Sequence, residues 1–292
     1  MSRLRREQIV GLLMTLPALL LLSIFFLYPL FNSFWMSLHK WPLFGKPKWV
    51  GLDNYVWMIN DERFWQCLKF TLVYTITVTP MLFIVAIGTA LLCNVKTWGT
   101  TFFRSIYFLP VVMSFATASF VWLWLYSEWY GVIIYLLKSI GFGPEDGQLS
   151  VWTDGWTAMW AVNTMVTWKF AGIQMIILIA GLQSIRDDYY EASRLMGASR
   201  FQTIWNITLP LLRPSIALAL ILSIAGSIQA YEQFQIMTRG GPMNETKTLV
   251  MLTIGMGFDY FKLGPAAALG VIIMSILFVI TLIQLRLFRK AY

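Results

Sequence analysis

Long apolar stretches alternate with short polar stretches along the whole chain. A helix needs about 20 apolar residues to cross roughly 30 Å of hydrocarbon, and six stretches reach that length. The first is longer than the hydrocarbon requires, so we expect residues 34–39 to lie at the interface. The pattern predicts an all-α membrane protein with six transmembrane helices, over residues 9–38, 70–92, 106–126, 158–182, 211–236 and 265–285.

Prolines occur within several of these stretches, and the expected effect of each is a helix kink. They are Pro17, Pro29, Pro80 and Pro110. Membrane helices tolerate proline when neighbouring groups bind the carbonyls that it leaves without a donor.

Composition and charge agree with a lipid environment. Of the 292 residues, 58% are hydrophobic and only 12% are charged. The net charge of +8 would suggest nucleic acid in a soluble protein, but here the charges lie between apolar spans. With a cytoplasmic N-terminus, the inside segments hold twelve bases and four acids, and the outside loops hold nine of each. The positive-inside rule therefore predicts that both termini are cytoplasmic, and no nucleic-acid partner is expected.

The loop between the fourth and fifth predicted spans, residues 183–210, is polar but has helical periodicity. Gly197 interrupts the periodic pattern, and Leu209-Pro210 ends it. Two short helices joined at Gly197 are therefore predicted, lying along the membrane surface. An interfacial amphipathic element is the general interpretation of such a segment.

A more specific interpretation comes from spacing within this loop. Glu191-Ala192-Ser193, Gly197, Ile207 and Leu209-Pro210 fit EAA-x3-G-x9-I-x-LP. This resembles the EAA loop of binding-protein-dependent ABC importer permeases, with Ser193 in place of the usual alanine. The resemblance implies a coupling helix that docks into a groove on a cytoplasmic ATPase. The residues it assigns to coupling are Glu191, Ala192, Ser193, Arg194, Gly197, Ile207, Leu209 and Pro210.

The residue types suit that task. Glu191 supplies a charge that fixes the orientation of the docked helix. Glycine at position 197 permits a backbone conformation or a close approach that other residues avoid. Pro210 can begin the next span, because a proline in the first turn loses no helical hydrogen bond.

Four further segments resemble carbohydrate-uptake permeases of the maltose-transporter type. They are VGLDNY at 50–55, FLP at 108–110, TRGGP with its following threonines at 238–249, and the segment 258–268 ending in GPAAA. The resemblance implies a single permease domain over residues 1–292, which works by alternating access in a prokaryotic inner or plasma membrane. The implied partners are a second homologous permease, two ABC ATPases and an extracytoplasmic solute-binding protein. The implied solute is a sugar or oligosaccharide; a polyol, a glycerol phosphate ester or an acidic oligosaccharide is the alternative.

Residues 241–248 nearly fit a phosphate-binding P-loop, but Thr246 replaces the second glycine and no strand precedes the segment. Gly240-Gly241-Pro242 is better interpreted as a turn. The subunit is therefore expected to bind no cofactor, with ATP and Mg held by the partner ATPase. A membrane-embedded transferase is the rival class, but the sequence lacks the expected cluster of catalytic groups, and no metal site is expected.

Lys169 and Glu232 are the charged residues inside predicted spans, where such groups usually face a cavity or each other. We predict that they form a structural ion pair or line the pathway. Polar side chains at helical spacing accompany them and are expected either to join helices or to bind sugar hydroxyls. Nearby aromatic residues either stack on the sugar or pack. The candidate pathway residues are Asn163, Thr167, Trp168, Lys169, Gln174, Gln229, Tyr231, Glu232, Phe234 and Gln235.

Overall fold

A computed structural model describes residues 3–95, 98–141 and 149–289 of the chain. Most of these residues are helical, and the chain divides into two compact units. The first comprises Met1–Glu62 with Thr253–Ser275, and the second comprises Arg63–Leu252 with Ile276–Tyr292. Lys96 and Lys290, which contribute to the predicted inside charge, lie outside the described residues.

The first unit begins with one long helical run: α1 (Arg3–Leu22), the π-helical turn η1 (Ser23–Leu27) and α2 (Tyr28–Ser37). Val10–Ser37 within it is long and apolar enough to cross a membrane. A short hairpin follows, in which β1 (His39–Lys40) pairs antiparallel with β2 (Lys48–Trp49).

The VGLDNY segment leads from this hairpin into α3 (Asp53–Ile59). Gly51 has a φ of +57°, a backbone conformation that favours glycine. The Asn54 side chain is buried and donates hydrogen bonds to the carbonyls of Ser37 and His39. The unit is completed by η3 (Gly255–Asp259) and by the first half of α15 (Leu263–Arg289). The VGLDNY segment thus fixes the turn between the hairpin and α3.

The second unit contains α4 (Glu62–Cys93), which begins at the boundary between the units, and α8 (Gly155–Ser184). These two helices pack through small and aliphatic side chains, among them Ala86, Ala90, Met175 and Leu178. Both pass the length and hydropathy requirements for a membrane span. The predictions for 70–92 and 158–182 are confirmed as helices, and each observed helix is longer than its apolar stretch.

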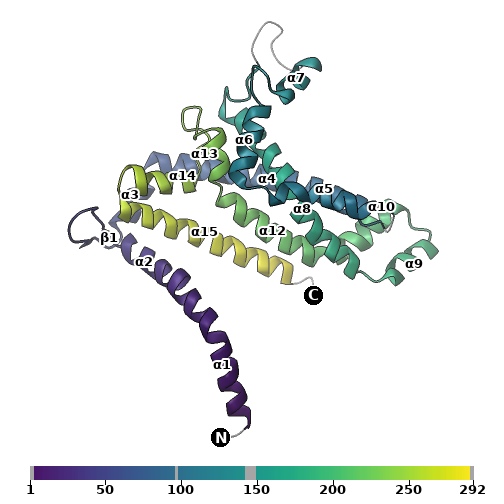
Figure 1. Cartoon of the computed structure of the whole chain (residues 1–292), viewed down its shortest axis with the longest axis horizontal. Helices are drawn as coiled ribbons and strands as arrows, with labels where there is room; N and C mark the ends of the chain where they lie inside the picture. The colour runs from purple at the N-terminus through teal and green to yellow at the C-terminus, as the bar shows by residue number, and fades with distance from the viewer. Residues whose placement is uncertain (1–2, 96–97, 142–148, 290–292) are drawn as a thin grey trace. The chain divides into compact units, whose positions relative to one another are not determined.

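The helix α5 (Thr100–Val112) lies against α8 at very close range (Figure 1). A β-carbon added to Gly172 would lie 2.1 Å from the Tyr107 carbonyl oxygen. Small residues commonly allow this close approach between membrane helices. The glycine on α8 therefore sets the distance between the two helices.

The third predicted span, 106–126, is not one straight helix. The helix α5 ends at Val112, and α6 (Phe115–Leu125) leaves it at 98°. Met113 is extended, and the Ser114 side chain accepts a hydrogen bond from the Thr117 backbone N–H, which starts α6. Pro110 lies within α5, so the break occurs at a helix cap beyond the proline and is more than a proline kink.

The fifth predicted span, 211–236, also differs. Helix α12 (Arg213–Ile228) ends early, and α13 (Glu232–Met237) forms a separate short helix. Thr248 fixes the break, because its buried hydroxyl donates to the Ala230 carbonyl. Arg200–Leu211 meets α12 at 68°, so this region qualifies as a span only as a bent pair. Among the described residues, four helices are long enough to cross a membrane, and the two bent pairs raise the number to as many as six.

The other elements of the second unit are α7 (Val132–Ser139), α9 (Asp187–Leu195), α10 (Arg200–Thr203), η2 (Ile204–Thr208), α11 (Leu209–Leu211) and α14 (Leu249–Ile254), which runs into the first unit.

Asp154 caps α8 by accepting backbone hydrogen bonds from Thr157 and Trp156. These bonds, the Thr157 backbone bond foremost, hold the pKa of the Asp154 carboxyl below its usual value.

Candidate functional site: a coupling loop, an inner cavity and an outer hollow

The predicted coupling loop, residues 183–210 and called the coupling loop below, begins with the predicted two short helices joined at Gly197. Helix α9 ends at Leu195, and Gly197 follows with a φ of +73°. The Gly197 N–H bonds to the Arg194 carbonyl and the Ala198 N–H to the Ser193 carbonyl, which is the hydrogen-bond pattern of a Schellman cap. The required glycine therefore ends α9 and turns the chain into α10.

Ser193, the departure from the usual alanine, has a structural partner. It is buried, and its hydroxyl lies 2.8 Å from the Thr203 hydroxyl on α10. A capping box between Ser199 and Gln202 starts α10. Ser193 thus ties the two short helices together at a position where alanine would only fill space.

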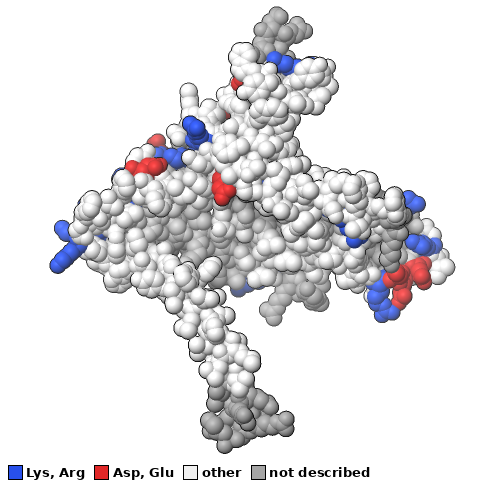
Figure 2. Space-filling model, in the orientation of Figure 1, with Lys and Arg blue, Asp and Glu red and all other residues white. Residues whose placement is uncertain are grey.

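The side of α9 opposite the buried Ser193 is exposed to solvent. Glu191, Ala192 and Arg194 are exposed, and so are Leu195 and Met196 at the helix end, by 89% and 79%. Figure 2 shows acidic and basic side chains gathered over this end of the second unit. A protruding helix end with apolar residues beside charges has the chemistry of a docking element.

The remaining residues that the sequence assigns to coupling lie in the helical run that leads to α12. Ile207 belongs to η2, and Leu209 and Pro210 belong to α11. Pro210 is in the first turn of α11, as predicted for a helix start, but the long helix itself begins at Arg213. Its first turn contains Pro214.

We expect Ser193→Ala to loosen the coupling loop without unfolding the chain. A lost internal hydrogen bond costs about 1 kcal/mol, or roughly a fivefold rise in the open population. Limited trypsin cleavage at Arg194 and Arg200 in the purified chain measures this. Ser184→Ala is the matched control, because among the described residues the Ser184 hydroxyl bonds only to the Gly181 carbonyl of its own helix. Equal cleavage of the two variants would contradict the assigned role of Ser193.

A separate cavity, here called the inner cavity, lies among the helices of the second unit. Its volume is about 240 Å³, and α4, α6, α8, α12 and α13 contribute to its walls. None of the described residues that line it carries a charge. They are Tyr74, Val78, Leu82, Phe115, Val166, Phe170, Ile173, Gln174, Ile177, Leu222, Ser223, Gly226, Ser227 and Gln233.

The two glutamines of the inner cavity, Gln174 and Gln233, are deeply buried. Gln174 is 4% exposed, and its Oε1 has no hydrogen-bond partner among the described residues. The Gln233 amide donates to the Tyr74 hydroxyl over 3.3 Å. Buried polar atoms almost always have a partner. An unpartnered amide oxygen at a cavity wall therefore indicates a group that a ligand or water satisfies.

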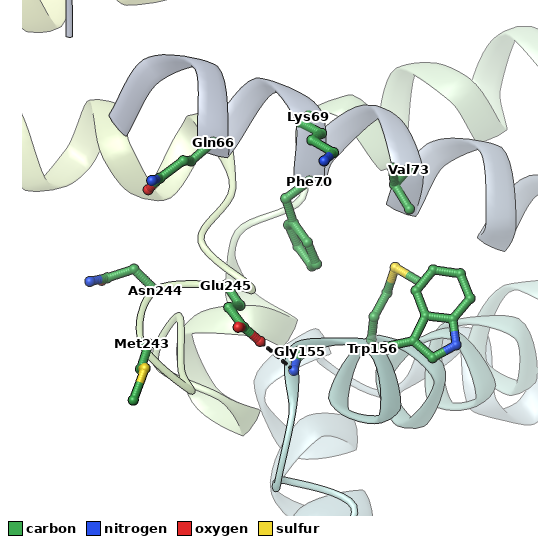
Figure 3. A pocket seen from close by; sticks show the side chains of 10 residues that line it. Gln66, Lys69, Phe70, Val73, Gly155, Trp156, Met243, Asn244 and Glu245 are labelled. Atoms are coloured by element: carbon green, nitrogen blue, oxygen red, sulfur yellow. Dashed lines mark hydrogen bonds between the residues drawn. The ribbon is translucent and has the colours of Figure 1, made fainter. Parts of the chain in front are cut away.

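A second depression, here called the outer hollow, has a volume of about 550 Å³ (Figure 3). Its walls come from the first turns of α4 and α8 and from the turn after α13. Glu245 of that turn accepts a hydrogen bond from the Gly155 N–H at the start of α8, over 2.7 Å. The lining residues are Gln66, Lys69, Phe70, Val73, Gly155, Trp156, Met159, Met243, Asn244 and Glu245.

The TRGGP segment forms the turn that the sequence predicts there. Arg239 and Gly240 both have positive φ. Thr246, which excluded a P-loop, is fully buried, and its hydroxyl donates to the Gly241 carbonyl over 2.7 Å. The threonine therefore stabilises the turn.

Only one of the predicted pathway residues, Gln174, lines the inner cavity. Asn163 and Thr167 are buried on α8, and Asn163 donates to Thr77. Trp168 packs against Trp122, with ring centroids 5.7 Å apart. Gln229, Glu232 and Gln235 do not all lie on one helix, because the chain breaks after α12. All three side chains are exposed.

Lys169 is buried, at 3% exposed, but it makes no ion pair within the described part of the chain. Its ammonium donates to the carbonyls of Pro110 and Met113, at the end of α5. It also lies 5.6 Å from the Phe115 ring and 5.4 Å from the Phe170 ring, both of which line the inner cavity. Glu232 is exposed and acts on the ammonium only through its charge.

The sequence analysis missed the residues that α4 and α13 bring to the inner cavity. Buried polar residues follow α4 at helical spacing: Thr71, Tyr74, Thr75 and Thr79. This stripe is visible in the sequence and would have identified the face that contains Tyr74. Nothing in the sequence alone places Gln233, because its position depends on the break before α13.

The family model and the similar proteins all point to the same class, permeases of binding-protein-dependent importers. The family described as "Binding-protein-dependent transport system inner membrane component" matches residues 59–291. A probable ABC transporter permease of Bacillus subtilis, YesP, is 30% identical over 96% of this chain and 90% of its own length. The trehalose/maltose transport system permease MalF of Thermococcus litoralis is 29% identical, over 97% of this chain and 95% of its own.

Another relative is the sulfoquinovosyl glycerol transport system permease SmoG of Agrobacterium fabrum. It is 30% identical, over 97% of this chain and 91% of its own. Among solved structures, a chain of a bacterial ABC transporter involved in the import of the acidic polysaccharide alginate has the same fold, with a TM-score of 0.82. That match has 22% identity and covers 98% of this chain and 96% of the other.

Proposed function

The chain belongs to the family of binding-protein-dependent transport system inner membrane components, and from this premise we propose that it is one of two permease subunits of an ATP-driven sugar importer. Its relatives are transport components, so the chain is not an enzyme. The rival idea of a membrane-embedded transferase is therefore set aside. The proposed work of the chain is to alternate between inward-facing and outward-facing states.

The geometry of the coupling loop is the observation that carries this proposal. The segment that matches the EAA spacing is a helix–glycine–helix unit whose far side is held by Ser193 and whose near side exposes Glu191, Leu195 and Met196. Because such an element is rigid and protrudes, a movement of a bound partner can be transmitted through it to the helices of the chain. The proposed partner is an ATPase that binds ATP and Mg, because the P-loop-like segment of this chain is a threonine-stabilised turn.

We also propose six membrane crossings with both termini in the cytoplasm. Four long helices and two bent pairs supply six crossings. The excess of bases over acids in the predicted inside segments supplies the orientation. This topology places the coupling loop on the cytoplasmic side and the outer hollow on the opposite side, where a solute-binding protein would deliver its cargo.

A neutral sugar is the proposed solute. The inner cavity offers hydroxyl and amide groups from Tyr74, Gln174, Ser227 and Gln233 beside two phenylalanine rings. Such a mixture of polar groups and aromatic faces suits sugar hydroxyls and pyranose rings. One relative is a trehalose/maltose transport system permease, and trehalose and maltose are neutral sugars.

The alternative of an acidic oligosaccharide or a phosphate ester has less support. An anionic solute favours bases in the cavity wall, and the described lining holds none. Lys169 does not fill this role, because its ammonium is committed to the carbonyls of Pro110 and Met113. The charge of the wall thus favours a neutral sugar or polyol.

Affinity purification of the tagged chain in mild detergent tests the proposal, with co-purifying subunits identified by mass. We expect a second six-span permease and an ABC ATPase, and we expect the ATPase to be lost when Glu191 and Gly197 are both replaced. A chain that purifies without an ATPase in every mild detergent would refute the importer assignment.

A further inference from the structure

A further cavity, here called the loop cavity, lies behind the coupling loop. Its volume is about 440 Å³. The helices α9 and α10 and the turn η2 supply most of its wall, and the adjoining ends of α4 and α8 complete it with Leu91, Asn94 and Leu182. All of these elements belong to the second unit. The loop cavity therefore lies where two long apolar helices meet a polar loop.

Two arginines, Arg194 of α9 and Arg200 of α10, are the only charged side chains among the described residues that line the loop cavity. Neither guanidinium forms a hydrogen bond or an ion pair with any described residue. Residues 195–199, which lie between them, include no acid. Glu191, the acid that precedes them on α9, does not line the cavity. The described wall is therefore basic and contains no counter-charge.

Hydroxyl groups hold the rest of the wall in place. The Tyr190 hydroxyl lies 3.4 Å from the Thr208 hydroxyl. The Ser193 hydroxyl lies 2.8 Å from that of Thr203, which donates in turn to the Ser199 carbonyl. These bonds join α9 to α10 and η2, so they fix the backbone from which both arginines extend. The guanidinium groups, with their several N–H donors, thus remain to bind a ligand.

The surroundings of the loop cavity are those of a membrane interface. Leu91 and Leu182 belong to the last turns of α4 and α8, which are both long and apolar enough to span a membrane. Next to Arg200, the rings of Phe201 and Trp205 stack with centroids 6.2 Å apart and are exposed by 73% and 63%. Exposed aromatic side chains near the ends of spans are typical of the level of lipid headgroups.

We propose that the loop cavity binds the headgroup of an anionic phospholipid, and that Arg194 and Arg200 hold its phosphate. Guanidinium groups match phosphate oxygens in charge and geometry, and basic pockets between membrane helices on the cytoplasmic side bind anionic headgroups. The two leucines favour a lipid over a free phosphate, because they can contact its glycerol and first methylenes. The inference rests on the proposed function only for the cytoplasmic position of the loop. A bound lipid ties α9 and α10 to the ends of α4 and α8.

Lipid titration of the purified chain tests this site without a partner subunit. The chain is kept in a mild non-ionic detergent and receives phosphatidylglycerol, phosphatidylcholine or inorganic phosphate. Native mass spectrometry gives the dissociation constant of the first bound lipid. Limited trypsin cleavage after Arg186, Arg194 and Arg200 shows where the lipid binds, because a bound headgroup shields the arginines that it contacts.

We expect phosphatidylglycerol to slow cleavage after Arg194 and Arg200 but not after Arg186. Phosphatidylcholine, whose headgroup has no net charge, and inorganic phosphate should have much less effect. Arg194→Gln and Arg200→Gln should each weaken phosphatidylglycerol binding about fivefold, because one base near an anionic headgroup contributes on that order. Arg186→Gln is the matched control, since Arg186 is an exposed base of the same loop that pairs with Asp188 and does not line the cavity. It should leave binding nearly unchanged.

Equal binding of phosphatidylcholine would overturn the proposal, because the site would then not recognise charge. An equal loss of binding in Arg186→Gln would also rule it out, because attraction to the basic loop in general would explain the binding. Full protection by inorganic phosphate at the same concentration would exclude the lipid and assign the site to a free phosphate. None of these outcomes depends on an ATPase, so the lipid site and the proposed function can fail separately.

Discussion

Replacement of Glu191 with alanine is expected to abolish ATP-driven uptake while the chain still inserts and folds. Glu191 is exposed on α9, so its loss should change the stability of the chain by no more than about 0.5 kcal/mol. Removal of one partner of a buried, charged interface contact costs about 2–5 kcal/mol. At about 1.4 kcal/mol for each tenfold change, the lower end already weakens ATPase docking more than tenfold.

Uptake by intact cells, the amount of chain in the membrane and co-purification of the ATPase are the three measurements. Asp187→Ala is the matched control, because Asp187 is an exposed acid in the first turn of the same helix and lies outside the EAA spacing. The control should keep most of its uptake. Normal uptake in Glu191→Ala, or an equal loss in Asp187→Ala, would show that Glu191 is not the coupling contact.

The coupling loop could be predicted well because its structure is encoded locally. A polar segment with helical periodicity and one glycine is sufficient to specify two short helices, and Gly197 adopts the positive φ that the glycine suggests. What the sequence did not reveal is the hydrogen bond between Ser193 and Thr203, which joins residues on different helices. The exposure of Leu195 and Met196 was not predicted either, because the spacing of the motif does not include these two residues.

The break in the fifth predicted span was not predicted, because apolar stretches do not show where a helix breaks. Residues 211–236 have the hydropathy of one span, yet the bond from Thr248 to the Ala230 carbonyl holds an interruption there. The stripe through Gln229, Glu232 and Gln235 assumed one helix, and the structure instead divides it between the end of α12 and α13. The stripe along α8 keeps its predicted spacing because α8 is unbroken, and Gln174 of that stripe lines the inner cavity.

The same limitation affected Lys169 and Glu232. Their positions in the apolar stretches suggested an ion pair, since opposite charges in lipid usually meet. The bend after α5 offered Lys169 a different partner. The last carbonyls of any helix lack donors, and a lysine from α8 supplies them at Pro110 and Met113.

Lys169→Met is therefore expected to weaken the packed state without reducing insertion. Insertion should not suffer, because a lysine near the centre of a span costs about 2.5–3.5 kcal/mol in the translocon scale. The packed state loses two hydrogen bonds, worth about 0.6–1.7 kcal/mol each in membrane proteins. At about 2–4 °C per kcal/mol, the melting temperature of the purified chain should fall by several degrees, and the Phe115 and Phe170 walls should lose their fixed positions.

The comparison with Glu232 decides between a helix-end cap and an ion pair. If Lys169 caps α5, Glu232→Gln should leave the melting temperature nearly unchanged, because this carboxylate is exposed and bonds to no described group. The double variant Lys169→Glu with Glu232→Lys should then melt no higher than Lys169→Glu alone, since a carboxylate cannot donate to the Pro110 and Met113 carbonyls. Recovery of stability in the double variant would instead establish the ion pair.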